Sequence, residues 1–267
     1  MPFVRSATAF LAVLMTAAAY AQTTGIDPAL LAKAKGGDAK SQSLIGEAYL
    51  NGFSRNGIFV GQDFAQALFW SRKAAEQNEQ VAQFDMGILY LRGLGVEQDY
   101  GKAGDWFLKS ANQGYPRAQY ELAMLFEDGQ GRIQSYTLAA EFLEKAAVQG
   151  DADSEFALGA LYDKGNGVPQ DFAKAAIWYG KAAEQGNLFA QFNLGISYFN
   201  GQGVARSYSD AYFWLNLAAS GNNGTLREEW MKARDKAAAN LTPEELSAAQ
   251  ARATAWMADH AAKAKVR

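Results

Sequence analysis

The sequence predicts an all-α solenoid of about five helix-turn-helix repeats of about 36 residues, with helical caps at both ends. Bulky aromatic residues recur every 36 positions, at Trp70, Trp106, Phe142, Trp178 and Trp214. Gly-x-Gly stretches recur at the same period, and the apolar positions before them have helical spacing. A fixed period of this length is typical of repeat arrays, in which each unit buries its apolar face against its neighbours.

Composition and charge narrow the classes of function. A chain of 267 residues with 49% hydrophobic side chains can bury a core. Its net charge of −3 gives no basic signature for nucleic acid. The sequence has no cysteine and a single histidine, His260, which excludes disulfides, thiolate chemistry and a multi-histidine metal site. We therefore expect no catalytic residues, no metal and no cofactor.

The first residues have the pattern of an export signal. Arg5 precedes an apolar run, and the small residues Ala19 and Ala21 stand at −3 and −1 before Gln22. The run of about 13 residues is too short to span a hydrocarbon core of about 30 Å. We expect cleavage after Ala21 to remove residues 1–21, leaving a periplasmic or secreted protein with no membrane span. The alternative is an N-terminal core helix.

A capping helix is expected within residues 22–36. Asp27 and Pro28 form an N-cap and first-turn pair, and paired glycines after Lys35 end the helix.

The repeat array is expected to cover residues 37–222, and its first repeat contains an insertion. Gly52 to Asp63 spans 11 positions, where the later repeats use 6. Loops tolerate insertions at small entropic cost, so the extra residues at 53–61 are interpreted as evolutionary drift without a function. Their apolar character leaves a second interpretation open, a protrusion that binds a partner.

Each repeat is expected to contain two antiparallel helices. One face of the first helix combines a small residue, an aromatic and a central glycine, as in Ala190, Phe192 and Gly195. Glycine then stops this helix, because it tolerates the left-handed backbone of a C-cap. A polar N-cap starts the second helix of the four later repeats, at Asp99, Ser135, Asp171 and Ser207.

The period fails after Asn222, and residues 223–267 are expected to form capping helices and a tail. Thr225 with Glu228, and Thr242 with Glu245, have the spacing of capping boxes. Two helices are predicted, over about 226–239 and 243–262. Terminal repeats need an altered outer face to prevent end-to-end stacking.

The repeat unit resembles that of the Sel1-like repeat family, a relative of tetratricopeptide repeats. Residues 154–186 match A-x-(F/Y)-x-L-G-x-x-Y-x-x-G-x-G-V-x-x-D-x-x-K-A-x-x-W-x-x-K-A-A-x-x-G almost throughout, and the resemblance covers about residues 37–222. It implies a right-handed α/α superhelix that acts as an interaction scaffold. Exported bacterial members resemble envelope regulators and factors that meet host proteins. This chain lacks the paired cysteines of a branch linked to β-lactam binding.

Several local patterns have structural interpretations that compete with functional ones. The Gly-x-Gly stretches lack the preceding strand and the third glycine of a nucleotide-binding loop, so we interpret them as C-caps. We call the five aromatic residues at the 36-residue period, from Trp70 to Trp214, the aromatic ladder. It is interpreted as inter-repeat core rather than a sugar-stacking surface. The carboxylate pairs Glu127-Asp128 and Glu244-Glu245 are interpreted as solvated rather than catalytic or cation-binding.

A partner-binding surface is predicted where first-helix residues vary while their neighbours keep the repeat pattern. In related arrays the first helices line the concave side, and varied side chains there suit recognition of a peptide or a partner helix. The alternative is an ordinary exposed face. The predicted residues are Ile88, Leu91, Arg92, Met124, Glu127, Asp128, Lys164, Ile196, Phe199 and Asn200.

The sequence therefore predicts a non-enzymatic adaptor of the bacterial envelope, possessing no nucleic-acid partner. Its expected partner is a protein, such as a segment of an envelope or membrane protein, docked on the concave face. Two alternatives stay open: a hydrolase of cell-wall or β-lactam substrates, and a secreted factor that binds host proteins.

Overall fold

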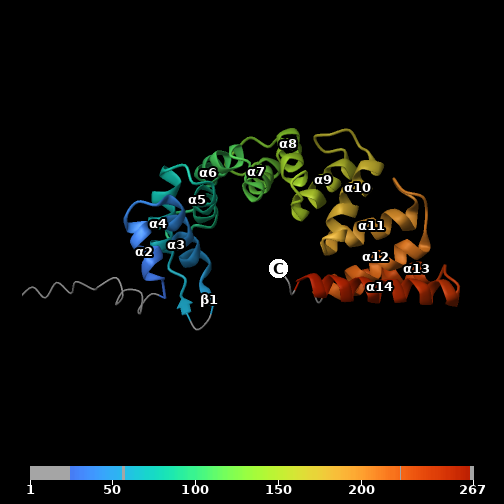
Figure 1. The fold of residues 1–267 in the computed structure, drawn as a ribbon. Coiled ribbons are helices and arrows are strands. Elements are labelled where there is room, and N and C mark those ends of the chain that lie inside the picture. Colours follow the sequence, from blue (N-terminus) through green and yellow to red (C-terminus); the bar gives the residue numbers. More distant parts are fainter. Residues whose placement is uncertain (1–24, 56–57, 223, 265–267) are drawn as a thin grey trace, which may run out of the picture. The chain divides into compact units, whose positions relative to one another are not determined.

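A computed structural model describes residues 25–55, 58–222 and 224–264 (Figure 1). The predicted signal peptide, residues 1–21, lies outside the described residues. Contacts divide the chain into two compact units, Met1–Gln98 and Asp99–Arg267, which we call unit 1 and unit 2. Both consist of tandem helix pairs, so the predicted α/α solenoid is confirmed, and the described ranges add one short β-hairpin to it.

Unit 1 contains a capping helix, the first repeat and the first helix of the second repeat. Its elements are α2 (Pro28–Lys35), α3 (Ala39–Asn51), β1 (Phe53–Arg55), β2 (Ile58–Val60), α4 (Phe64–Glu76) and α5 (Gln80–Arg92). Helix α3 packs against α2, α4 and α5, and α4 packs against α5. The N-cap prediction for α2 is confirmed, because the Asp27 carboxylate accepts a hydrogen bond of 2.7 Å from the backbone N–H of Ala29.

The insertion in the first repeat forms a β-hairpin rather than an irregular loop. β1 and β2 pair antiparallel, with Phe53 opposite Val60 and Arg55 opposite Ile58. Val60 is buried and Phe53 is partly exposed. The apolar residues that were unusual for a solvent loop thus belong to strands at the edge of unit 1.

Unit 2 contains the remaining helices. They are α6 (Tyr100–Asn112), α7 (Pro116–Asp128), α8 (Tyr136–Ala147), α9 (Ala152–Lys164), α10 (Phe172–Glu184), α11 (Leu188–Asn200), α12 (Tyr208–Gly221), α13 (Arg227–Ala238) and α14 (Pro243–Ala264). Each helix from α6 to α12 packs against the next one along the chain. Within the described ranges of both units, none of the helices is long and apolar enough to cross a bilayer.

The two glycines of each inter-helix stretch have different tasks. Gly165 ends α9 in the left-handed conformation, with φ 73°, as predicted for a C-cap. Gly167 is also left-handed, with φ 70°, and a side chain there would overlap the backbone of Tyr136 at the start of α8. The second glycine therefore lets each inter-helix loop lie directly on the preceding repeat.

The aromatic ladder is only partly core, which corrects the interpretation from sequence. Trp70 and Trp214 are 5% and 7% exposed. The three ladder residues between them are half-buried. Each of these three has a lysine ammonium over its ring, and the distances from Nζ to the ring centroid are 3.9 Å for Lys109 and Trp106, 4.8 Å for Lys145 and Phe142, and 3.8 Å for Lys181 and Trp178. These cations cover the part of the ring that packing leaves open.

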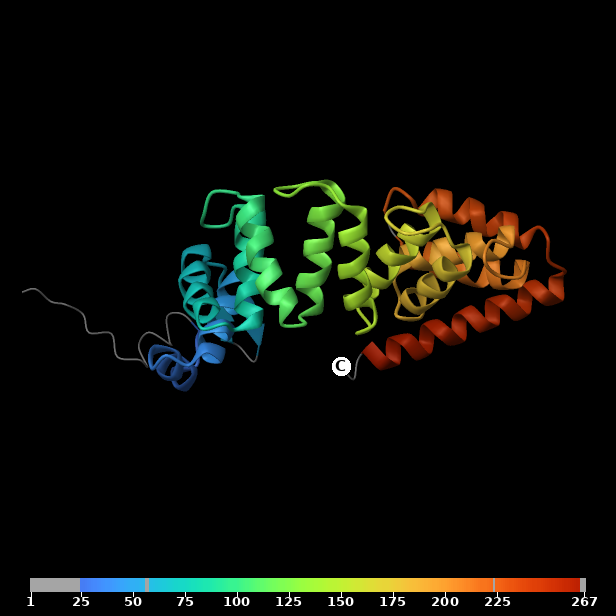
Figure 2. The same ribbon diagram turned by 90° about the horizontal axis from the view of Figure 1, so that it is seen from above.

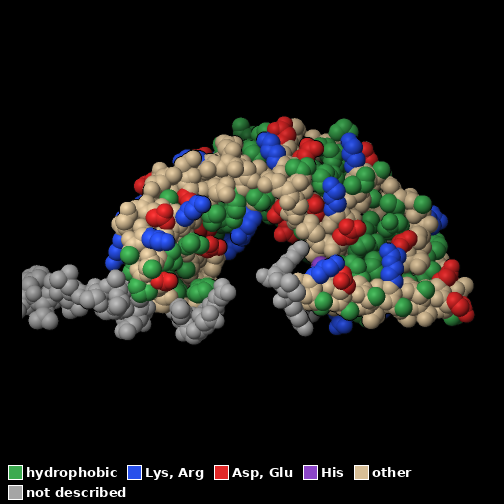
Figure 3. Space-filling view, in the orientation of Figure 1, with side chains coloured by type: hydrophobic (Ala, Val, Ile, Leu, Met, Phe, Trp, Pro, Cys, Tyr) green, Lys and Arg blue, Asp and Glu red, His purple; other side chains and the backbone are tan. Residues whose placement is uncertain are grey.

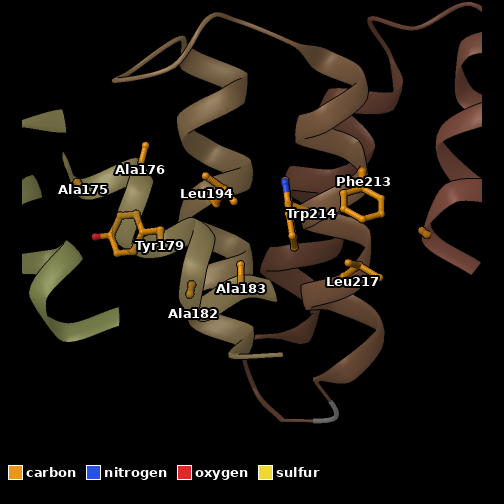
Figure 4. Close-up of a cluster of buried hydrophobic side chains, with 11 residues drawn as sticks. Ala175, Ala176, Tyr179, Ala182, Ala183, Leu194, Phe213, Trp214 and Leu217 are labelled. Carbon is orange, nitrogen blue, oxygen red and sulfur yellow. The ribbon is translucent and has the colours of Figure 1, made fainter. Parts of the chain in front are cut away.

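The core of unit 2 is built from small residues between aromatic ones. In one cluster Ala182 and Ala183 of α10 lie among Tyr179, Leu194 and Trp214 (Figure 4). Small side chains allow neighbouring helices to approach closely, while the aromatic rings fill the space between them.

Two helices follow the array, and the second one turns back along it. In Figure 2, α14 is a single long helix beside the helix pairs of unit 2, and it packs against α12. The Arg252 guanidinium lies 2.6 Å from the Asp210 carboxylate and 3.9 Å from the Phe213 ring centroid. The capping box of Thr242 and Glu245 is confirmed. The box expected at Thr225 is wrong, because the N-cap of α13 is Leu226 with no side-chain hydrogen bond.

Candidate partner-binding surface

In unit 1 the predicted surface residues lie near the end of α5. Ile88 is only 7% exposed, since α5 packs against both α3 and α4. A partner cannot contact this side chain without disturbing the packing of unit 1. Leu91 is half-buried and Arg92 is exposed. Variation at position 88 therefore reflects packing between neighbouring repeats rather than recognition.

In unit 2 the predicted residues fall on one side of the first helices α7, α9 and α11. We call this side the first-helix face, and it comprises Met124, Glu127, Asp128, Lys164, Ile196, Phe199 and Asn200. Asp128, Lys164 and Asn200 occupy the last turn of their helices and are exposed. The other four are half-buried, with part of each side chain accessible. Repeat-equivalent positions thus bring these residues to the same side of successive helices.

The first-helix face is acidic over α7, through Glu127 and Asp128, and basic over α9, through Lys164. Each of these two helices carries three acidic residues and one basic residue, whereas α11 carries no charge. Burial raises the pKa of Glu127, the neighbouring Asp128 raises it further, and Lys164 lowers it. Burial, reinforced by Asp153 and nearby acids, raises the pKa of Tyr120 to about 12. Both helices thus carry a net negative charge, and on the first-helix face the acids of α7 lie near the Lys164 ammonium of α9.

The same face becomes apolar over α11. Ile196 and Phe199 pack beside the cluster of Tyr212 and Leu215. The ring of Phe199 also meets Tyr208 edge to face, at a centroid distance of 5.5 Å. Figure 3 shows charged side chains of both signs between apolar patches over unit 2. Such a face can hold an apolar anchor at one end and a cation at the other.

The structure favours the structural interpretations of the other local patterns. The Gly-x-Gly stretches follow helices rather than strands, and their first glycines are C-caps. His260 stacks on Trp256, with ring centroids 4.5 Å apart. Among the residues that the structure describes, no group of three or more acidic or histidine side chains could hold a metal ion.

Sequence reasoning missed one concave feature, which we call the N-terminal hollow. It lies in unit 1 between α2, α3 and the hairpin, and it has a volume of about 520 Å³. Its lining includes Ile26, Leu30, Leu44, Glu47, Phe53 and Val60. The apolar residues of the insertion were the available signal, but the sequence did not reveal which helices they face.

Comparison with known proteins identifies the repeat. The family model of the Sel1 repeat matches five consecutive segments, residues 39–79, 80–115, 116–151, 152–187 and 188–223. No curated protein matches the chain.

Two solved structures are similar over most of the chain. One is a protective antigen present in uropathogenic Escherichia coli strains and displaying an SLR fold, with 35% identity, a TM-score of 0.67, and coverage of 72% of this chain and 40% of that one. The other is a Sel1 repeat protein from Oxalobacter formigenes, with 35% identity, a TM-score of 0.67, and coverage of 76% and 57%. The chain thus spans about half the length of these relatives.

Proposed function

Given that the chain belongs to the Sel1 repeat family, we propose that it is an exported adaptor of the bacterial envelope, which docks a partner protein on its first-helix face. Sel1 repeat proteins are protein-interaction scaffolds, and their fold is generally non-enzymatic. The partner is a segment of an envelope or membrane protein. Export follows from the predicted cleavage after Ala21.

One observation carries the proposal. The buried positions Ala82, Ala118, Ser154 and Ala190 keep a small residue in successive repeats, whereas the exposed positions of the first-helix face do not keep one residue type. The last exposed residue of α7, α9 and α11 is Asp128, Lys164 and Asn200 in turn. Stacking of the repeats does not require an acid, a base and an amide at these three positions. Recognition of one partner segment does require different side chains along the surface that it contacts.

Affinity capture with charge-reversal variants tests the proposal. The double variant Asp128→Lys, Lys164→Glu reverses two exposed charges and leaves the net charge unchanged. A tagged protein, processed by its own cells, is used to capture partners from the envelope fraction for mass spectrometry. We expect the wild type to recover a partner that the double variant loses by at least about tenfold, equivalent to about 1.4 kcal/mol.

A matched control separates the face from general electrostatics. The double variant Glu141→Lys, Lys236→Glu changes exposed residues on α8 and α13, away from the first helices. It should recover the partner as the wild type does. Equal recovery by both double variants would show that the first-helix face is not the docking surface.

A second candidate is a secreted factor that meets host proteins. It is favoured by the 35% identity to a protective antigen of uropathogenic Escherichia coli. Fractionation of the producing cells distinguishes the two functions. The adaptor should be recovered mainly from the periplasmic fraction and the secreted factor mainly from the culture medium, each with an N-terminus at Gln22.

A further inference from the structure

The N-terminal hollow is an apolar feature of unit 1 that the proposed function does not use. Two of its lining side chains are large, apolar and open to solvent: Leu44 is 55% exposed and Phe53 is 43% exposed. Ile26 and Leu30 contribute a further apolar wall from the segment around α2. Exposed apolar side chains gathered around one hollow indicate a surface that a partner covers.

Hydrogen bonds show that α2 stands in the position of a second helix of a repeat. The Gln42 side chain donates to the carbonyl oxygen of Ala34, across the junction from α2 to α3, at 2.9 Å. The Gln83 side chain donates in the same way to Ala75, across the junction from α4 to α5, at 3.4 Å. Helix α2 therefore packs on α3 as α4 packs on α5.

A second helix in this array normally has a first helix beside it. On α4 this place is taken by α3, where Gly46 is so close to Ser71 that a side chain at Gly46 would overlap it. The residue of α2 that corresponds to Ser71 is Leu30, and it faces the hollow instead of a helix. The hollow thus lies where the first helix of a preceding repeat would be.

The other wall of the hollow leads to the same conclusion. Leu44 and Glu47 of α3 occupy the positions of Asp85 and Ile88 of α5. On α5, which packs against α3, both residues are buried, with exposures of 3% and 7%. On α3 the corresponding residues line an open hollow. The stacking surface of the repeats therefore continues past α3, and no helix among the described residues covers it.

We propose that the N-terminal hollow receives an amphipathic α-helix of a partner protein, which takes the place that a first helix occupies beside α4. The partner helix presents aliphatic side chains to Leu30, Leu44 and Phe53, and a small residue at the closest approach. This choice of occupant shares one premise with the proposed function, cleavage after Ala21, which leaves only residues 22–24 before Gly25, too few for a helix of the 13 residues found in α3. The site is separate from the first-helix face, and docking there does not depend on docking on that face.

A peptide that copies α3 is the natural probe, because α3 fills the equivalent place against α4 and α5. The peptide comprises residues 38–52. A hydrocarbon link between two of its side chains, on the side opposite Gly46, stabilises the helix, because an isolated helix of this length is marginal in water. Binding of the labelled peptide to the whole purified protein is measured by fluorescence anisotropy. We expect saturable binding that Leu44→Asp in the protein weakens by at least about tenfold.

Ile177→Asp is the matched control, because Ile177 is 59% exposed on α10 in unit 2. It should leave peptide binding unchanged, and Asp128→Lys should do the same. Absence of saturable binding, or equal binding by the wild type and the Leu44→Asp variant, would overturn the proposal. It would also be overturned if sedimentation showed a dimer that Leu44→Asp dissociates, since a second copy would then cover the hollow.

Discussion

At the scale of single residues, glycine at the second position of each Gly-x-Gly stretch is required by space as well as by backbone angle. Gly203 repeats the geometry of Gly167, and a side chain there would overlap the backbone of Phe172 at the start of α10. The stretch is therefore a contact between successive repeats, not merely a helix stop. Its regular recurrence follows from stacking and needs no ligand.

The two requirements can be separated by alanine substitution. Gly150 has a φ of 85° but open space around it, so Gly150→Ala should cost only the left-handed strain, about 1–2 kcal/mol. Gly167→Ala adds steric overlap with Tyr136, which costs about 1–3 kcal/mol more, and should destabilise unit 2 by about 2–5 kcal/mol in total. Urea unfolding followed by circular dichroism measures both variants. Equal decreases in the free energy of unfolding for the two variants would show that the loop around Gly167 relaxes without an energetic cost.

Glu127 offers a second test at this scale, because burial and Asp128 raise the pKa of its carboxyl group. The folded protein then binds the proton more tightly than the unfolded chain does. Proton binding by Glu127 therefore stabilises the folded state at pH values below the ordinary glutamate pKa of about 4.3. This contribution to the free energy of unfolding is lost as the pH rises through the raised pKa of Glu127. Ionised Glu127 therefore lowers the stability of the folded state at neutral pH.

Glu127→Gln should raise the melting temperature at pH 7, because glutamine resembles the protonated carboxyl group. The difference from the wild type should shrink towards zero near about pH 4, where both side chains are neutral. Differential scanning calorimetry from pH 4 to pH 8 measures this trend. The exposed Glu141→Gln serves as the control, and a variant difference independent of pH would contradict the burial argument.

At the scale of elements, packing of α14 against α12 changes which residue types are found on the face of α12 that α14 covers. In the four earlier repeats the position of Leu217 holds lysine, at Lys73, Lys109, Lys145 and Lys181. Leu217 and Phe213 are buried, and Phe213 meets Arg252 of α14. The last repeat exchanges a solvated lysine for an apolar contact because a helix covers it.

Removal of α14 should expose both apolar side chains. A chain that ends at Thr242 should lose about 3–6 kcal/mol of stability, corresponding to two large buried side chains, and should aggregate. Sedimentation velocity and binding of a hydrophobic dye measure the effect. The shortened chain with Phe213→Glu and Leu217→Lys restores residue types of the third repeat, and it should remain monomeric. Aggregation of this control would place the defect elsewhere.

At the scale of the whole molecule, each unit is held together mainly by contacts between consecutive elements. In unit 2 every helix from α6 to α13 packs on its neighbour in the chain, and α14 adds a contact with α12. Stability of such an array is approximately a sum of repeat and nearest-neighbour terms. An exposed face of a first helix can consequently change its residues without a large effect on the stacking core. This separation makes the first-helix face available for recognition.

The period of the sequence by itself determined the helix pairs, the glycine C-caps and most N-caps, because these depend on residues within one or two turns. It also assigned the repeat-equivalent residues of unit 2 to one side of the first helices. The sequence did not reveal that Ile88 is buried, that the insertion forms a hairpin, or that α14 covers Phe213. Only the tertiary structure decided these points, because burial depends on which distant element covers a face. The N-terminal hollow is the clearest case, since α2 and α3 obey the repeat pattern and only their packing shows that, in the part of the chain that the structure describes, no first helix lies beside α2.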